Sequence, residues 1–170
     1  MLQITPERMP EFRPFRMNSG PTSIRPAQLA EREVLEDLQR RSSMHEPMYR
    51  AQLEANPDAI ELPPSQITAG LVRVAELDGV VVGFAVLLEA AGGACELDGL
   101  FVEPNRMRSG IGRRLIEDAK RIASERGATL IQVIANPQAV AFYESVGFAA
   151  AGTAETRFGP APRMALRVDS

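Results

Sequence analysis

The sequence predicts a mixed α/β domain of about seven strands and four helices, with a largely antiparallel first half. The chain has 170 residues, of which 45% are hydrophobic and 24% charged, as expected of one globular domain with a proper core. Apolar residues recur at helical spacing in some segments and form short strand-like runs in others. Glycine and proline turn signals separate these segments, the clearest being Asp78-Gly79 between two apolar runs.

The first half of the chain is predicted to supply three strands and two helices. Pro26 and Pro47 suit the first turn of a helix, and Ser42 and Ser43 are expected to end the helix that Pro26 begins. The predicted elements are a strand at 22–25, helices at 26–41 and 47–55, a proline-rich loop at 56–64, and strands at 71–77 and 80–88.

The second half is predicted to alternate strands and helices before ending in two strands. The predicted elements are a strand at 94–102, a helix from 111, a strand at 129–135, a helix at 137–146, and strands at 148–153 and 163–168. Gly127 and Gly147 are natural helix ends. The run at 129–135 is apolar enough that we expect burial on both of its faces. A loop containing Phe158-Gly159-Pro160 is expected to join the last two strands.

The N-terminal segment differs in composition from the rest of the chain. Residues 1–21 contain four prolines, which interrupt helices and central strands, so we expect an extended or disordered tail there. Residues 22–170 are then the folded domain.

Composition also excludes several functional classes. The formal net charge of −3 argues against a nonspecific nucleic-acid-binding protein. No apolar run has membrane-spanning length and no signal peptide is visible, so we expect a cytoplasmic protein without a membrane partner. Cys95 is the only cysteine and His45 the only histidine, which leaves no cysteine-rich metal site, and no metal is expected.

A basic glycine loop lies between the strand at 94–102 and the helix from 111. Gly110 and Gly112 flank the helix start, where unpaired backbone N–H groups and a partial positive charge can hold an anion. Arginines at 106, 108, 113 and 114 add positive charge. The loop therefore predicts a phosphate or pyrophosphate ligand, although the spacing matches neither the Walker pattern nor the dinucleotide fingerprint.

This loop and a second segment, Asn136 to Phe148, resemble the GNAT acetyltransferase superfamily. The loop is similar to the family's pattern Gln/Arg-x-x-Gly-x-Gly/Ala after an apolar-Val-x-Pro strand end, with Met107 departing from Gln/Arg at the first position. The second segment is similar to the signature Asn-x-x-Ala-x-x-Phe-Tyr-x-x-x-Gly-Phe. The resemblance covers about Thr22 to Val168 and implies the GNAT acyl-CoA N-acyltransferase fold.

The resemblance implies transfer of the acetyl group of acetyl-CoA, the cosubstrate, to a primary amine by direct attack in a ternary complex. It places the backbone of Leu100, Phe101 and Val102 along the acyl and pantetheine arm. Asn136 would contact the pantetheine, and Tyr143 would protonate the leaving sulfur. The loop residues that would hold the pyrophosphate are Met107, Arg108, Ser109, Gly110, Ile111, Gly112 and Arg113.

The amine acceptor must lose a proton before it attacks, and a carboxylate is the natural base. Glu96 and Asp98 lie two apart on one strand and so share a face. Glu96 matches the catalytic glutamate of histone-acetylating members of the family, and Asp98 or a water chain is the alternative. The acceptor itself, a small molecule or a peptide amine, is expected near residues 44–49 and 158–163.

Two questions stay open at this point. A noncatalytic acyl-CoA-binding or regulatory module on the same fold is the alternative function, because a fold does not fix an activity. A homodimer is likewise open, since no interface can be recognised in these residues.

Overall fold

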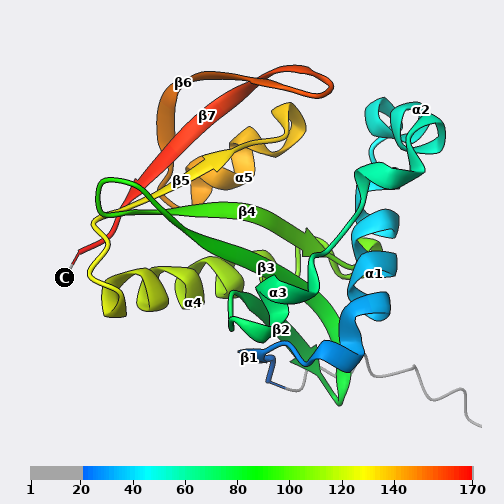
Figure 1. The fold of residues 1–170 in the computed structure, drawn as a ribbon, viewed down its shortest axis with the longest axis horizontal. Helices are drawn as coiled ribbons and strands as arrows, with labels where there is room; N and C mark the ends of the chain where they lie inside the picture. The colour runs from blue at the N-terminus through cyan, green and yellow to red at the C-terminus, as the bar shows by residue number, and fades with distance from the viewer. Residues whose placement is uncertain (1–20, 170) are drawn as a thin grey trace, which may run out of the picture.

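The computed structural model describes residues 21–169, so the predicted tail lies outside the described residues apart from Pro21. These residues form one seven-stranded mixed sheet with the strand order β1-β2-β3-β4-β5-β7-β6 (Figure 1). The strands are β1 (Ser23–Pro26), β2 (Val72–Leu77), β3 (Val80–Ala90), β4 (Ala94–Val102), β5 (Leu130–Ile134), β6 (Ala149–Thr156) and β7 (Gly159–Arg167). All pairs are antiparallel except β4 with β5. The predicted mixed sheet of seven strands is confirmed.

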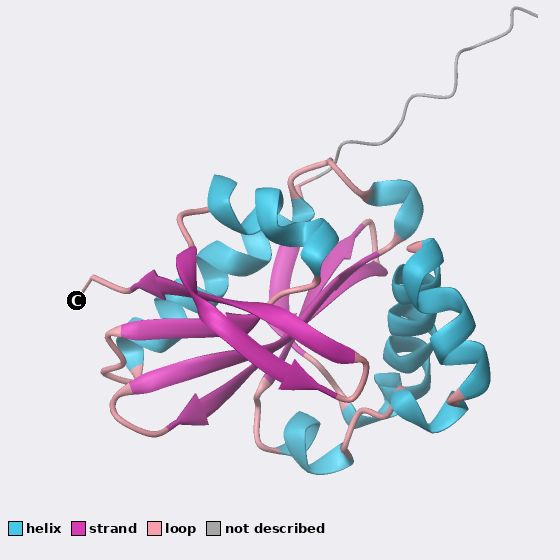
Figure 2. Ribbon diagram, turned by 90° about the horizontal axis from the view of Figure 1, so that it is seen from above, coloured by secondary structure: helices cyan, strands magenta, loops and turns pink. Residues whose placement is uncertain are grey.

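Five α-helices flank this twisted sheet (Figure 2), one more than predicted. They are α1 (Arg32–Met44), α2 (Pro47–Ala55), α3 (Pro64–Thr68), α4 (Ile111–Glu125) and α5 (Val140–Ser145). The additional helix, α3, has five residues and one buried side chain, Ile67. A segment that short shows no helical periodicity, which is why the sequence did not predict it.

Several predicted boundaries are wrong. Pro26 is the last residue of β1 and does not begin a helix, because α1 starts only at Arg32, after a 3-10 turn at Leu29–Glu31. The helix predicted at 137–146 is a 3-10 turn followed by α5, and β6 continues to Thr156.

The helix α1 continues through Ser42 and Ser43 to Met44, because serine in a helix costs only a few tenths of a kcal/mol and α1 is held by the buried Leu35 and Leu38. Strand β7 begins at Gly159, so Gly159 and Pro160 belong to the strand rather than to the preceding loop. Proline is tolerated there because β7 pairs with β5 only from residue 163 onward.

The core lies on both faces of the sheet. On one face, α4 and α5 pack on β3, β4 and β5 around Leu97, Leu115 and Ile131. On the other face, α1 and α3 pack on β2 and β3 around Leu38 and Phe84. The burial of these side chains supplies most of the stability of such a domain.

Strand β5 is buried on only one face, contrary to the prediction. Ile131 and Val133 are 1% and 3% exposed, whereas Ile134 is 42% exposed. The second face of β5 is not covered by a helix but lines two surface hollows. The apolar composition of the strand gives no sign of this difference between its two faces.

The parallel strands β4 and β5 separate part-way along their length (Figure 1). Their pairing runs from Ala94↔Leu130 to Leu97↔Val133, while β4 continues to Val102. A β-bulge lies at the point of separation: Leu87 pairs with Leu97 and Val86 with Gly99, which leaves Asp98 without a partner. Bulges bend a strand and are common beside active sites. One edge of β4, from residue 98 onward, therefore faces no strand.

Candidate active site

The loop between β4 and α4 presents a row of unpaired backbone N–H groups. Arg108 and Gly110 have φ angles of 63° and 88°, in the left-handed region, and the Ser109 hydroxyl donates to the carbonyl of Arg106. Within the described part of the chain, none of the six amides from residue 108 to residue 113 donates to a protein acceptor. Successive N–H groups in such turns, together with a helix N-terminus, form a concave anion site.

Side chains around this loop leave the backbone accessible. Met107 is 37% exposed, and Arg108, Ser109 and Gly110 are also exposed. An anion bound here would be held by backbone N–H groups, so the methionine at the first position of the loop does not obstruct the site. Arg113 donates to the carbonyl of Ser145 at 3.3 Å, which links the start of α4 to the end of α5.

Gly112 brings the two sequence motifs together. A side-chain carbon at this position would lie 3.1 Å from the ring of Phe142, closer than ordinary van der Waals contact. Glycine is therefore required for the start of α4 to approach α5. Phe142 in turn packs edge to face on Tyr143, with ring centroids 5.3 Å apart.

Tyr143 lies in the core on the face of the sheet that α4 covers. The residue is 7% exposed, and its ring also packs on Phe148 at a centroid distance of 5.2 Å. Burial raises the pKa of Tyr143 well above its usual value, because the phenolate would be poorly solvated. The hydroxyl is therefore harder to ionise than that of a solvated tyrosine.

Leu100, Phe101 and Val102 form the end of β4 beside the loop. Leu100 and Val102 pack toward α4, whereas Phe101 packs on Phe84 on the opposite face, with centroids 5.2 Å apart. Their backbone pairs with β3 on one side and has no strand on the other. An extended ligand can form backbone hydrogen bonds with such an open edge.

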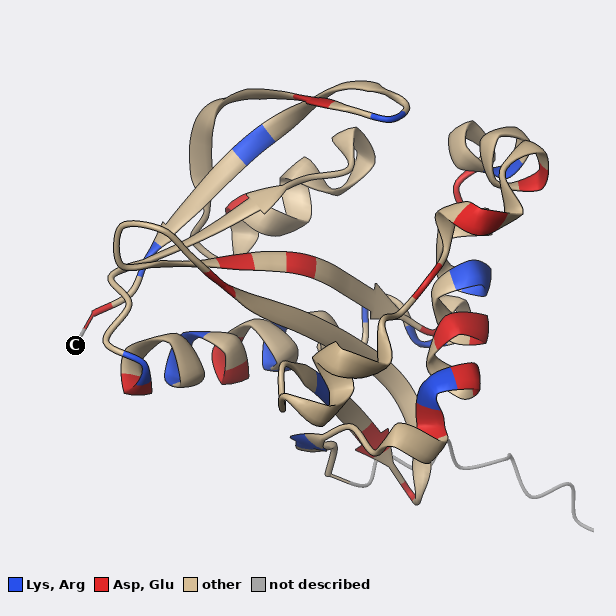
Figure 3. Ribbon diagram, in the orientation of Figure 1, with Lys and Arg blue, Asp and Glu red and all other residues tan. Residues whose placement is uncertain are grey.

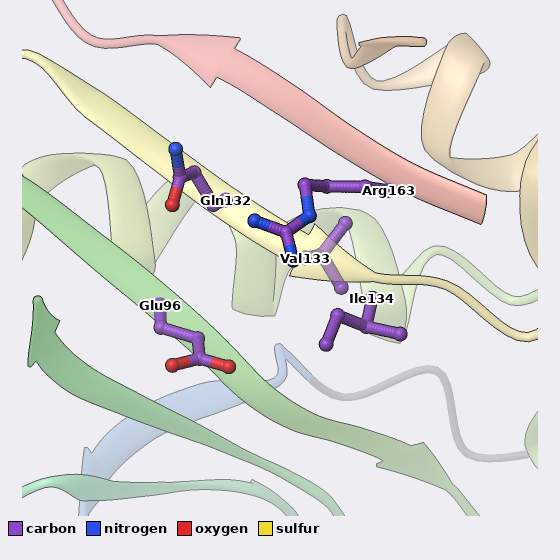
Figure 4. Close-up of a pocket in the computed structure, with 5 residues that line it drawn as sticks. All are labelled: Glu96, Gln132, Val133, Ile134 and Arg163. Carbon is purple, nitrogen blue, oxygen red and sulfur yellow. The ribbon is translucent and has the colours of Figure 1, made fainter. Parts of the chain in front are cut away.

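A hollow of about 150 Å³ lies where β4 and β5 separate, and Figure 4 shows the five residues that line it. They are Glu96, Gln132, Val133, Ile134 and Arg163. Asp98 is not among them. Asp98 is largely exposed, although partial desolvation beside the sheet raises its pKa above the ordinary aspartate value.

A second hollow, of about 200 Å³, shares the lining residue Ile134 with the first. Its walls come from α2, from the end of β5 and from the β6–β7 hairpin. Asn136 lines it, and the side-chain oxygen of Asn136 accepts a hydrogen bond from the N–H of Gln138 at 2.9 Å. The lining residues are Met48, Tyr49, Gln52, Ile134, Ala135, Asn136, Pro137, Thr156, Phe158, Pro160 and Ala161.

Comparison with protein families identifies the domain. Residues 32–148 match the family described as the acetyltransferase (GNAT) family. The chain belongs to the GNAT acetyltransferase family. No curated protein sequence matches it.

Solved structures share the GNAT fold at low sequence identity. The PaiA N-acetyltransferase from Thermoplasma acidophilum, in complex with coenzyme A, is 20% identical with a TM-score of 0.70, covering 87% of this chain and 99% of that one. The ribosomal-protein-S18-alanine N-acetyltransferase from Escherichia coli is 20% identical with a TM-score of 0.64, and the match covers 88% of this chain and 95% of that chain. N-acetylglutamate synthase from Neisseria gonorrhoeae, complexed with coenzyme A and N-acetyl-glutamate, is 20% identical with a TM-score of 0.68. The match covers 89% of this chain and 36% of that chain.

In this GNAT domain the structure brings some of the predicted site residues together. Glu96 lines the first hollow, and Asn136 and Tyr49 line the second. His45 and Glu46, also considered near the acceptor, line neither hollow. The catalytic and coenzyme-binding roles assigned to individual residues stay predictions.

The sequence placed Arg163 at the end of the acceptor region 158–163 but gave it no role, and it did not single out Gln132 or Gln52. Gln132 is the only polar residue of β5, and a polar residue in an apolar strand is a signal that could have identified an open face. Gln52 carries a buried side-chain oxygen that has no hydrogen-bond partner among the described residues.

Metal-binding clusters and membrane-spanning helices are both absent from the described residues. Residues 21–169 contain no group of three or more histidine, cysteine, aspartate or glutamate side chains placed to hold a metal ion. None of the helices in the described range is long and apolar enough to cross a membrane.

Proposed function

We propose that the protein is an N-acetyltransferase that moves the acetyl group of acetyl-CoA to a primary amine by direct attack in a ternary complex. The observation that carries the proposal is that an anion-binding loop, an open strand edge and a hollow with a carboxylate follow one another along the same strand. The six unpaired amides of the loop lie beside the open edge of β4, and this strand leads to the hollow that contains Glu96. Family membership supports the acetyl transfer itself.

The loop fits the pyrophosphate of coenzyme A. Amides of residues 108–113 are donors without a protein acceptor among the described residues, and Arg106, Arg108 and Arg114 supply positive charge around them. The backbone of residues 100–102 would hold the pantetheine arm along the open edge. Acetyl-CoA, when bound, supplies the reactive thioester. The chain supplies the orientation of the two substrates, which contributes much of the rate in such reactions.

Glu96 is the base in this proposal. Its carboxylate lines the hollow at the point where β4 and β5 separate, and it would accept a proton from the incoming ammonium group, directly or through water. Asp98 is the weaker candidate because it lies in the bulge and lines neither hollow.

Tyr143 is the acid. Its hydroxyl is protonated at neutral pH, as in an ordinary tyrosine, and would give its proton to the departing sulfur. Burial raises the pKa of Tyr143, which makes the hydroxyl a weaker acid than a solvated phenol. The only cysteine, Cys95, is 1% exposed, so a covalent acetyl-cysteine stage has no accessible thiol. Direct transfer between the two bound substrates is the route that these side chains support.

Calorimetric titration with acetyl-CoA tests the loop, and Gly110→Ala is expected to weaken binding about tenfold. An alanine at φ 88° costs about 1–2 kcal/mol in the conformation that aligns the loop amides. The added carbon meets no other atom within 4 Å, so the effect is confined to the loop backbone.

Gly92→Ala is the matched control. Gly92 also has a positive φ, 74°, in open space, but it lies in the turn between β3 and β4 away from the glycine loop. Both variants should lose similar stability, and only Gly110→Ala should lose affinity. Equal affinity in the two variants, or no saturable binding by the folded wild-type protein, would contradict the loop assignment.

A further inference from the structure

Arg163 and Glu96 face the same side of the sheet, although they lie 67 positions apart in the sequence. The register aligns Glu96 with Gln132 on β5, and Ile134 on β5 with Arg163 on β7. Residues two apart on a strand share a face, so all four lie opposite the buried Ile131 and Val133. Figure 3 shows the acidic residues of β4 and the basic residues of β7 on either side of β5.

The guanidinium of Arg163 has no protein partner within the described range. Among the other described arginines outside the glycine loop, only Arg167 and Arg114, in the first turn of α4, form neither an ion pair nor a side-chain hydrogen bond. Arg114 and Arg167 are exposed to water, whereas Arg163 is partly buried and lines the first hollow. A partly buried charge without a partner is costly, so Arg163 is suited to an anionic group of a ligand.

The first hollow has opposite charges at its two sides. Figure 4 shows the guanidinium of Arg163 extending across β5 toward the strand that bears Glu96, with Gln132 nearby. The ion pairs of the described residues include none between Arg163 and Glu96, although both side chains line the same hollow. A molecule that carries an ammonium group and a carboxylate a few ångströms apart complements this arrangement.

The second hollow adds an apolar region next to this charged pair. Met48 and Ile134 are 51% and 42% exposed, and Phe158 and Pro160 lie on the same lining. An exposed ion pair between Arg157 and Asp58, at 3.2 Å, links the β6–β7 hairpin to the segment after α2. Exposed apolar side chains in a concave site favour an apolar ligand group.

We propose that the acceptor is a free α-amino acid with an apolar side chain, and that Arg163 is the residue that binds its carboxylate. This inference rests on the proposed function. The ammonium group loses a proton to Glu96, nitrogen bonds to the acetyl carbon, and the bond from that carbon to sulfur breaks as Tyr143 gives sulfur a proton. The second proton on nitrogen is lost as the amide forms and passes through water to restore Tyr143, and Glu96 releases its proton to solvent. The apolar side chain occupies the second hollow. A lysine side chain within a protein lacks the carboxylate for which Arg163 is placed.

The test compares L-leucine, L-methionine and L-phenylalanine with the amines that result from removing their carboxylates. For the amino acids, Arg163→Gln is expected to raise KM about 10- to 100-fold with kcat changed less than about threefold. For the carboxylate-free amines, the same variant should leave KM unchanged. Arg163→Lys should recover part of the loss, and Arg167→Gln on the same strand is the matched control without effect.

Binding measured without turnover separates this inference from the proposed function. Wild-type protein should bind the amino acids, and Arg163→Gln should lose that binding while retaining acetyl-CoA affinity. Wild-type protein that binds acetyl-CoA but neither binds nor acetylates any amino acid would overturn the inference alone. Wild-type protein that acetylates the carboxylate-free amines as well as the amino acids would also overturn the inference. So would an Arg163→Gln variant whose kcat falls equally for the amino acids and for the carboxylate-free amines. Loss of acetyl-CoA binding and of all acetyl transfer in folded wild-type protein would instead overturn the proposed function.

Discussion

Replacement of Glu96 by glutamine is expected to lower kcat/KM for acetyl transfer at neutral pH by about 10²- to 10³-fold. Glutamine preserves the shape of the side chain in the first hollow but cannot accept the proton of the ammonium group. The deficit should shrink as the pH rises, because alkaline solution deprotonates the amine without help from the protein. Initial rates measured across the pH range for the wild type and the variant check both parts of this prediction.

Glu89→Gln is the matched control for this experiment. Glu89 is an exposed residue of β3 that pairs with Cys95, the neighbour of Glu96, so the substitution makes the same chemical change on the same sheet. It should not alter the rate or the pH profile. If Asp98→Asn loses all activity and Glu96→Gln is unaffected, the base is Asp98 and not Glu96.

Replacement of Tyr143 by phenylalanine is expected to lower kcat about 10- to 100-fold, with the KM for acetyl-CoA changed only a few-fold. Phenylalanine keeps the edge-to-face packing on Phe142 and Phe148 but removes the hydroxyl that would protonate the leaving sulfur. Since burial raises the pKa of Tyr143, the wild-type rate should not fall near pH 10, where an ordinary tyrosine ionises. An unchanged kcat across the pH range would remove the acid role from this residue.

The same variant has a stability signature that does not depend on activity. A tyrosine whose pKa is raised in the folded state contributes stability that is complete below about pH 10, its unfolded pKa. That contribution is lost as the pH rises toward the folded-state value, because the unfolded chain then releases its proton first. Wild-type protein should therefore lose free energy of unfolding more steeply above pH 10 than Tyr143→Phe does, as measured by denaturant titration. Parallel slopes would mean that the hydroxyl is not desolvated in the fold.

Some elements whose bounds are marked by a local sequence pattern were predicted correctly from the sequence. The bounds of β4 and α2 were predicted correctly, because a hairpin turn, a proline and an apolar pattern mark them locally. The glycine loop was predicted for the same reason, since its unpaired amides belong to six neighbouring residues.

The charged hollow could not be predicted in this way. Glu96, Gln132 and Arg163 meet only because the strand order is β4-β5-β7 and because the register places them on one face. Strand order and register arise from tertiary packing, and no local pattern specifies them. The bulge at Asp98 was hidden similarly, because it is defined by the partner strand β3 and not by the sequence of β4.

The release of coenzyme A from acetyl-CoA in the presence and absence of primary amines tests the central claim most directly. We expect release that requires an amine, with an equal amount of N-acetylated amine identified by mass spectrometry and no acetyl group attached to the protein. Protein that binds acetyl-CoA saturably but releases no coenzyme A with any amino acid, amine or peptide would contradict the account. In that case the domain would be a noncatalytic acyl-CoA-binding module on the GNAT fold.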